Sequence, residues 1–382
     1  MKKYTAITIL LCLFTLLINN QSIAQADRAE KEIQSIMETT KVMGLSVAVV
    51  KNNNILYNHS FGLKDAASKA PLGNQDIFRI ASISKSFTTT AIMQLVAKKK
   101  LKLDQDISEL IGFKVRNPKY PNTVITLKMI LSHRSSINDS EGYFSLDAID
   151  PNKNSNWANC FNAYEPDKGY MYCNLNYNMA GAIVEKITGV RFDSYIQQQI
   201  LTPLGLYGGY NVSQLDSNLI AKIYEFNKGN GTFVHSPNAY DPRTKEISEY
   251  IIGRTTPIFS PTGGMKISAH DLAKYMIMHS QLGKYKGVKI MPRKLAKQMQ
   301  AIQSPEEGYG MAIETTSKLI EGKSMIGHTG SAYGLYSIMF FEPKEKIGFV
   351  VISNGCDSKY YNGFNEVLYK TVNSLYRNFI QE

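Results

Sequence analysis

The sequence predicts an α/β protein of the α+β type, with an antiparallel sheet flanked by terminal helices and a mainly helical inserted subdomain. Three observations predict this architecture. Strand-like apolar segments stand near both ends of the chain, helical periodicity marks both termini, and the middle alternates short helical stretches with loops rich in Asn, Asp, Pro and Gly. The front and back strands would therefore share one sheet, which the middle would cap.

Residues 1–24 have the pattern of a secretory signal peptide. Two lysines precede an apolar run from Ile7 to Ile18, and a small-x-small motif ends at Ala24. The run is too short to cross a bilayer, and no later segment has about 18 uninterrupted apolar residues. We therefore expect a bacterial protein that is exported to the periplasm or the medium, with no transmembrane segment in the mature chain.

The front of the remaining chain predicts a helix, a hairpin and a second helix. Charged and apolar residues occur at helical spacing from Ala26 to Thr40. Gly44 to Lys51 and Ile55 to Gly62 are typical of two strands joined by an asparagine-rich turn. Phe78 to Ala81 then leads as an extended segment into a long helix from Ser82 to about Lys99.

The middle and the back of the chain differ in pattern. From about Leu101 to Arg254, helical stretches such as Leu127 to Ser132 and Asn176 to Thr188 alternate with loops, and sustained strands are few. The back predicts two helices and a strand pair, with these bounds: helix Ala269 to Leu282, strands Leu335 to Phe341 and Ile347 to Ser353, and helix Phe364 to Phe379.

Length and charge limit the remaining possibilities. Residues 25–382 exceed the usual length of one compact unit, so we expect one domain made of an α/β subdomain, residues 25–90 and 255–382, and a helical subdomain, residues 91–254. The formal net charge of +11 suits an anionic surface such as a cell envelope. The chain lacks an arginine-rich cluster or a basic stripe with interleaved aromatics, so no nucleic-acid partner is expected. The oligomeric state stays open.

Cysteines are sparse outside the leader. Cys160, Cys173 and Cys356 are too few for a disulfide scaffold. Cys160 and Cys173 pairing across a short loop and three unlinked thiols are both consistent with the sequence.

The most informative stretch is Ser82-Ile83-Ser84-Lys85, where an extended segment turns into a helix. A serine hydroxyl is a weak nucleophile, and a lysine one helical turn later lies on the same face and can take its proton. The alternative is a plain helix start, with Ser82 as its cap and Lys85 as a solvated charge.

Three further patches support the catalytic interpretation. They are Tyr172-Cys173-Asn174, Ser260-Pro261-Thr262-Gly263-Gly264 and His328-Thr329-Gly330. With these patches in this order, the sequence resembles the penicillin-recognising serine hydrolases, in the branch of class C β-lactamases, D-alanyl-D-alanine carboxypeptidases, D-aminopeptidases and related esterases. The phrases FRIASISKSFT, YCNLNYNMAGAIVEKITG, SPTGGMKISAHDLAKY and GHTGSAYG carry the resemblance over nearly the whole mature chain. It implies a β-lactamase/transpeptidase-like fold.

The resemblance also implies catalytic roles. Ser82 would attack a carbonyl and become acylated, and Lys85 would help to deprotonate it. Tyr172 would relay a proton between nucleophile and leaving group, either as phenolate or through hydrogen bonding.

Four further residues, together with the backbone of Ser82, would bind the substrate or the oxyanion. Asn174 would hold Lys85 with its carbonyl and the substrate amide with its NH₂ group. The backbone N–H groups of Ser82 and Ser331 would form an oxyanion hole. Gly330 would let the substrate lie along the strand, and His328 would hydrogen-bond the substrate or the Tyr172 hydroxyl.

Histidine at position 328 bears on the substrate. Class C β-lactamases usually carry lysine there, whereas histidine, with a reference pKa of about 6.5, is mostly neutral at pH 7. Peptidase or esterase activity is therefore expected more than efficient β-lactam turnover. The histidines at 59, 133, 235, 270, 279 and 328 lack metal-ligand spacing, so neither a metal nor another cofactor is expected.

The favoured interpretation is an exported serine hydrolase that forms an acyl-enzyme at Ser82. Its substrate would be a small molecule or peptide: a peptidoglycan-like amide of the D-Ala type, a β-lactam or an ester. The alternative is a catalytically idle protein that uses the cleft to bind peptidoglycan or β-lactams.

Overall fold

The computed structural model describes residues 24–381 of the chain. The expected signal peptide thus lies outside the described residues, apart from Ala24. Among the described residues, no helix is both long and apolar enough to span a membrane.

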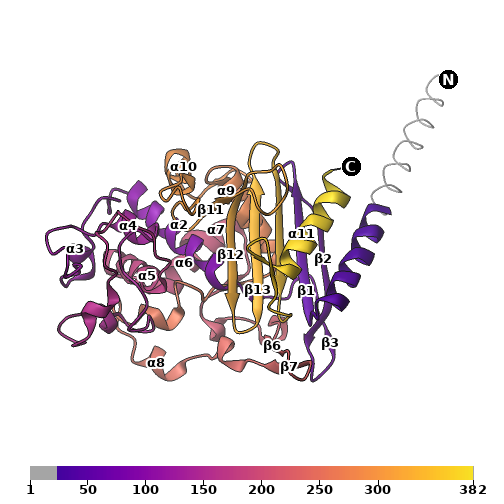
Figure 1. Cartoon of the computed structure of the whole chain (residues 1–382), viewed down its shortest axis with the longest axis horizontal. Helices are drawn as coiled ribbons and strands as arrows, with labels where there is room; N and C mark the ends of the chain where they lie inside the picture. Colours follow the sequence, from indigo (N-terminus) through magenta and orange to yellow (C-terminus); the bar gives the residue numbers. More distant parts are fainter. Residues whose placement is uncertain (1–23, 382) are drawn as a thin grey trace, which may run out of the picture.

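One antiparallel sheet of seven strands organises the molecule (Figure 1). Its front and back strands meet where β1 pairs with β14, from Leu45 opposite Ser353 to Lys51 opposite Ile347. Expectation and structure agree here, because β-branched and aromatic residues fill these strands. In spatial order the strands are β11 (Glu314–Thr316), β12 (Met325–Ala332), β13 (Leu335–Glu342), β14 (Ile347–Ser353), β1 (Gly44–Lys51), β2 (Asn54–Asp65) and β3 (Ala70–Pro71).

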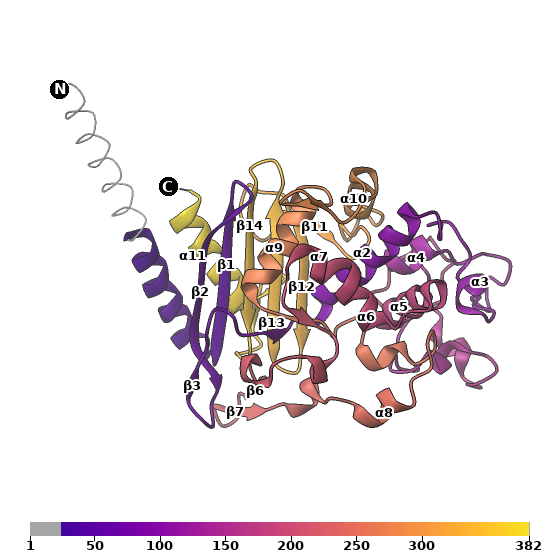
Figure 2. The ribbon, with the colours of Figure 1, turned by 180° about the vertical axis from the view of Figure 1, so that it is seen from behind.

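Both faces of this sheet are covered by helices. The helix over residues 24–39 and α11 (Glu366–Phe379) pack on one face, where Val47 and Val49 are buried (Figure 1). Helix α9 (Ala269–Ser280) covers the opposite face, where Ala48 and Val50 point (Figure 2). Successive strand residues therefore enter two different cores, which explains why β1, β13 and β14 are apolar along their whole length.

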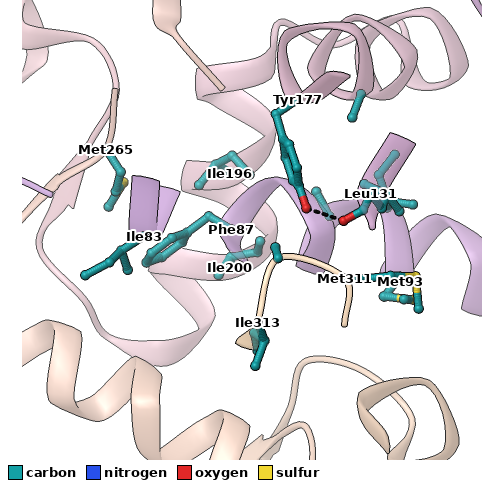
Figure 3. Close-up of a cluster of buried hydrophobic side chains, with 14 of the residues drawn as sticks. Ile83, Phe87, Met93, Leu131, Tyr177, Ile196, Ile200, Met265, Met311 and Ile313 are labelled. Atoms are coloured by element: carbon teal, nitrogen blue, oxygen red, sulfur yellow. Dashed lines mark hydrogen bonds between the residues drawn. The ribbon is translucent and has the colours of Figure 1, made fainter. Parts of the chain in front are cut away.

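Helix α2 (Ser84–Ala97) runs through the middle of the helical part and is buried from Ser84 to Leu95. Phe87 stacks on Tyr275 of α9, with ring centroids 3.8 Å apart. On another side lies Tyr177 of α5 (Asn174–Thr188), whose hydroxyl donates to the carbonyl of Leu131 (Figure 3). The nucleophile segment therefore precedes one of the most enclosed helices of the protein.

Shorter elements complete the chain. The remaining α-helices are α3 (Ile107–Ile111), α4 (Leu127–Leu131), α6 (Phe192–Ile196), α7 (Thr202–Leu204), α8 (Thr244–Ser248) and α10 (Arg293–Gln300). The small sheets contain β4 (Phe78–Arg79), β8 (Lys266–Ile267) and β5 (Gly208–Gly209); β6 (Tyr224–Asn227) and β7 (Thr232–His235); β9 (Lys284–Tyr285) and β10 (Val288–Lys289); and β15 (Tyr360–Tyr361) and β16 (Phe364–Asn365).

Two strand features were missed by the sequence pattern. Strand β12 is not among the strands expected with bounds from the sequence, because its sequence MIGHTGSA has few β-branched apolar residues. The hairpin β6–β7 interrupts the middle segment, where helices were expected. Of the two alternatives for Cys160 and Cys173, the structure shows unlinked thiols rather than a disulfide.

Because of His279, we expect the free energy of unfolding to fall in acid. It is fully buried on α9, neither ring nitrogen has a hydrogen-bond partner among the described residues, and burial lowers its pKa to about 3. The unfolded chain, with a histidine pKa of about 6.5, binds the proton first, so stability is full above that value and falls at lower pH. This histidine alone should cost about 3 kcal/mol between pH 7 and pH 4. Urea unfolding of wild type and His279→Leu at both pH values tests this, and parallel losses in the two proteins would contradict it.

Candidate active site

Ser82 lies in a tight turn rather than inside α2. It is the middle residue of the 3₁₀ turn η1 (Ala81–Ile83), so the α-helix begins two residues later than expected, at Ser84. Ala81 has a φ of 45°, in the left-handed region that costs a non-glycine residue roughly 1 kcal/mol. The surrounding structure therefore holds the nucleophile segment in a strained conformation.

Lys85 points at Ser82 from the first turn of α2. Its Nζ atom lies 3.1 Å from Ser82 Oγ, 2.9 Å from Asn174 Oδ1 and 3.0 Å from the carbonyl oxygen of Thr262. The side chain is fully buried, which rules out the solvated charge of the plain helix start. Burial lowers the pKa of Lys85 to about 7, although Asp139 acts in the opposite direction. A substantial neutral fraction at pH 7 makes this amine a competent base.

Tyr172 lies beside this pair, just before α5. Lys85 Nζ is 4.7 Å from the centroid of its ring, and Tyr172 lines the same pocket as Ser82. Burial raises the pKa of Tyr172, and the nearby Ser82 side chain only partly offsets this. Of the two expected forms, phenolate or hydrogen-bonding phenol, this environment favours the phenol.

Asn174 connects three segments. Its Oδ1 accepts from Lys85 at 2.9 Å, as expected, and from Thr262 Oγ1 at 2.8 Å. Its Nδ2 donates to Asp139 Oδ2 at 2.9 Å, so one amide hydrogen that was assigned to the substrate is directed at a carboxylate. Asn174 thus positions the base.

Asp139 is a site residue that the sequence analysis missed. Its carboxylate accepts from the backbone N–H groups of Asn174, at 2.8 Å, and Leu175, at 2.9 Å. The first turn of α5 has no acidic residue of its own, so Asp139 caps this helix from a distant loop. No local pattern indicated the pairing, because the two segments are 35 residues apart.

Asp139→Ala should lower kcat/KM by about 100-fold, because displacement of a positioned group by about 1 Å has that effect. Loss of the carboxylate also removes the charge that favours protonated Lys85, so the acid limb of the pH profile should move to lower pH. Asp139→Asn, which keeps the shape without the charge, should shift the limb with a smaller rate loss. An unchanged limb in both variants would contradict this role.

His328 was expected to hydrogen-bond the substrate or the Tyr172 hydroxyl, and in the structure it contacts another tyrosine, Tyr309. Its Nε2 atom lies 3.1 Å from the hydroxyl of Tyr309, whereas its ring centroid is 6.2 Å from that of Tyr172. Its Nδ1 contacts the carbonyl of Thr329. Burial, with a smaller effect of Lys85, lowers the pKa of His328 to about 4, so the ring is neutral at pH 7.

Close packing within the protein explains why position 330 is a glycine. A Cβ atom there would lie 2.3 Å from the carbonyl oxygen of Ile80 and 2.4 Å from Ser337 Oγ. Ser337 Oγ already donates to that carbonyl at 3.0 Å. The glycine therefore lets β12 approach the turn that carries Ser82. Its expected role in letting the substrate lie along the strand stays a prediction.

Ser82 lines a pocket together with several of the other predicted site residues. Of the predicted residues, Ser82, Tyr172, His328 and Ser331 line it, whereas Lys85 and Asn174 lie behind Ser82. Four residues that the sequence analysis did not select complete it with Thr329: Tyr170, Glu307, Tyr309 and Glu314. Of these four residues, only Tyr170 lies near a sequence motif, two positions before Tyr172, that could have indicated it. The oxyanion role of the Ser82 and Ser331 N–H groups stays a prediction.

Solved structures of known proteins share this fold. The octameric penicillin-binding protein homologue from Pyrococcus abyssi matches 92% of this chain and 77% of its own, with a TM-score of 0.73 and 24% identity. EstCE1, a hydrolase with promiscuous acyltransferase activity, matches 94% of this chain and 100% of its own, with a TM-score of 0.72 and 18% identity. The class C β-lactamase from Rhodobacter sphaeroides matches 93% and 99%, with a TM-score of 0.69 and 16% identity. At these identities the likenesses show the fold alone, and they confirm the β-lactamase/transpeptidase-like architecture.

Sequence relatives agree with the structures. Penicillin-binding protein 4* of Bacillus subtilis (strain 168) is 26% identical over 238 residues, 58% of this chain and 50% of that protein. Protein flp of Staphylococcus aureus (strain N315) is 25% identical over 349 residues, 88% of this chain and 64% of that protein. The chain spans about half to two thirds of the length of these curated relatives. The family model described as Beta-lactamase matches residues 29–363, and the chain therefore belongs to the Beta-lactamase family.

Proposed function

We propose that this protein hydrolyses amides or esters through an acyl-enzyme at Ser82, with Lys85 as the base. One observation carries the proposal: the Lys85 amine is fully buried and lies 3.1 Å from Ser82 Oγ. No carboxylate among the described residues forms an ion pair with it, so the amine can lose its proton near neutral pH. An idle binding cleft has no chemical need for a desolvated amine at this position.

The reaction proceeds in two balanced steps. Lys85 takes the Ser82 proton as Oγ bonds to the carbonyl carbon, and the bond to the leaving group breaks as that group receives this proton from Lys85 through the Tyr172 phenol. Water then attacks the acyl carbon and gives one proton to Lys85, which passes it to Ser82 Oγ as the ester bond breaks. The N–H groups of Ser82 and Ser331 would stabilise the negative oxygen in both steps.

The proposed substrates are peptides or amides of the D-Ala type and related esters, and the proposed location is outside the cytoplasm. A neutral His328 offers no permanent cation for the carboxylate of a β-lactam, which favours peptidase or esterase activity. The similar proteins include one named as a penicillin-binding protein and one described as a hydrolase with promiscuous acyltransferase activity, and both descriptions are consistent with this proposal. The division into two subdomains, residues 25–90 with 255–382 and residues 91–254, belongs to this proposal.

A fluorophosphonate probe tests the nucleophile. The wild type should be labelled, Ser82→Ala should not, and mass spectrometry should place the label on the Ser82 peptide. Ser331→Ala is the matched control, because Ser331 lines the same pocket and the substitution keeps its backbone N–H. Equal labelling of wild type and Ser82→Ala would overturn the nucleophile assignment, and no labelling of the wild type by any acylating probe would favour the idle cleft.

The pH profile of kcat/KM should have an acid limb near pH 7. The pKa of Lys85 is lowered to about 7 by burial, and only the neutral amine accepts the proton, so activity rises as pH increases through this value. The raised pKa of Tyr172 predicts no loss of activity in the mildly alkaline range. Because the pKa of Glu314 is also near 7, the profile of Glu314→Gln is the control, and it should keep the limb. Disappearance of the limb in that variant would contradict the assignment.

A further inference from the structure

We propose that the pocket beside Ser82 selects substrates whose leaving group carries a positive charge, with Glu314 and Glu307 as the specificity-determining residues. The inference rests on the proposed function and narrows it. Among the proposed amides and esters, it favours cationic leaving groups and disfavours those that carry a carboxylate, such as a terminal D-Ala, so the D-Ala residue of a favoured substrate would belong to the acyl part.

Strand register places Glu314 in the pocket. Glu314 of β11 stands opposite Gly327 of β12, and residues two and four positions further along β12 share a face with it. These residues are Thr329 and Ser331, which line the same pocket as Ser82. The carboxylate is therefore built into the sheet edge beside the nucleophile.

The two carboxylates lack a compensating partner. Within residues 24–381, the side-chain carboxylates of Glu307 and Glu314 form no hydrogen bond or ion pair, although both residues line the pocket. Burial and the charge of Glu307 raise the pKa of Glu314 to about 7, and the exposed Lys318 opposes them. A carboxylate held in this way gains from a cation that enters the pocket.

The other charged and titratable groups that face Glu314 do not cancel its charge. Burial raises the pKa values of Tyr170, Tyr172 and Tyr309, with Glu314 itself contributing to each, so these side chains are neutral phenols. His328 is neutral at pH 7 because burial lowers its pKa to about 4. Above pH 7 the pocket therefore has a negative potential.

Aromatic faces complete the recognition site. The ring centroids of Tyr170 and Tyr309 are 5.6 Å apart, and those of Tyr172 and Tyr309 are 6.4 Å apart. Clusters of aromatic rings attract ammonium groups through their negative faces. Because Tyr172 is the proposed proton donor to the leaving group, the group next to these rings is the leaving group rather than the acyl part.

Three thioesters of N-acetyl-D-alanine provide the test, with thiocholine, 3,3-dimethylbutanethiol or 3-mercaptopropionate as the leaving thiol. The first two have nearly the same shape and differ in charge, and the third is an anion. Thiol release is measured with a disulfide reagent at pH 8, where Glu314 is mostly ionised. The variants are Glu314→Gln, Glu307→Gln and the control Glu306→Gln, whose exposed side chain lies outside the pocket lining.

In the wild type, kcat/KM should be about tenfold higher for the thiocholine ester than for the neutral ester and lower still for the anion. Glu314→Gln should bring the first ratio below about threefold, Glu307→Gln should reduce it less, and Glu306→Gln should leave it unchanged. Equal rates for the three esters in wild type, or an unchanged ratio in a Glu314→Gln protein with wild-type thermal unfolding, would overturn the inference. Thiol release that is equal in wild type and Ser82→Ala would instead overturn the proposed function, and the inference with it.

Discussion

Lys85→Met should lower kcat/KM by at least about 1,000-fold, because it removes the group that takes the proton from Ser82. Methionine nearly matches the length of the lysine stem and carries no charge into the buried site. The variant should therefore fold, and its thermal unfolding should stay close to that of the wild type. Steady-state hydrolysis of an activated ester and the rate of fluorophosphonate labelling should fall together.

Lys266 provides a matched control for this result. It is also buried, and its Nζ atom donates to the carbonyl of Tyr210 at 2.7 Å, but it makes no contact with Ser82. Lys266→Met should change kcat/KM by less than about tenfold, since it removes a structural hydrogen bond only. Equal activity losses in the two variants would mean that burial of an amine, and not its place beside Ser82, explains the effect.

The sequence pattern predicted the fold where apolar residues determine it. Segments such as Gly44–Lys51 and Ile347–Ser353 are buried on both faces, so burial alone specifies them as strands. Strand β12 is different. Its glycines are there because Gly327 and Gly330 lie against neighbouring backbone or side chains, which is a requirement of close packing that a propensity pattern does not record.

The candidate site likewise contains contacts that the local sequence predicts and contacts that only the tertiary fold creates. Ser82 and Lys85 are three positions apart, so helical geometry predicts their contact from the sequence, and the contact is present. Asp139, Tyr309 and Glu314 reach the site from segments that only the tertiary fold brings together. His328 was expected to hydrogen-bond the substrate or the Tyr172 hydroxyl, whereas the fold places the Tyr309 hydroxyl beside it, because β11 and the preceding loop lie next to β12. Long-range partners of this kind need the topology.

Glu185 should give the largest stability effect of a single substitution. The side chain is fully buried on α5, and its carboxylate accepts four hydrogen bonds. The donors are Phe192 N at 2.7 Å, Tyr250 Oη at 2.6 Å, Gly253 N at 2.6 Å and Thr256 Oγ1 at 2.7 Å. They join α5 to the segment that leads to Thr262, whose carbonyl contacts Lys85. The carboxylate thus supports the site from behind.

Glu185→Leu should lower the free energy of unfolding by about 3–5 kcal/mol, because it leaves three buried donors and one partly buried donor without an acceptor. Glu185→Gln keeps one acceptor oxygen but turns an NH₂ group toward donors, so it should also destabilise the protein, though less. Urea unfolding at pH 7 measures both, with the exposed Glu249→Gln as the control, expected within about 0.5 kcal/mol of wild type. If Glu185→Leu unfolded like that control, the four bonds would contribute nothing net. If it lost stability as expected, activity of the remaining folded fraction would show how far the position of Lys85 depends on this contact.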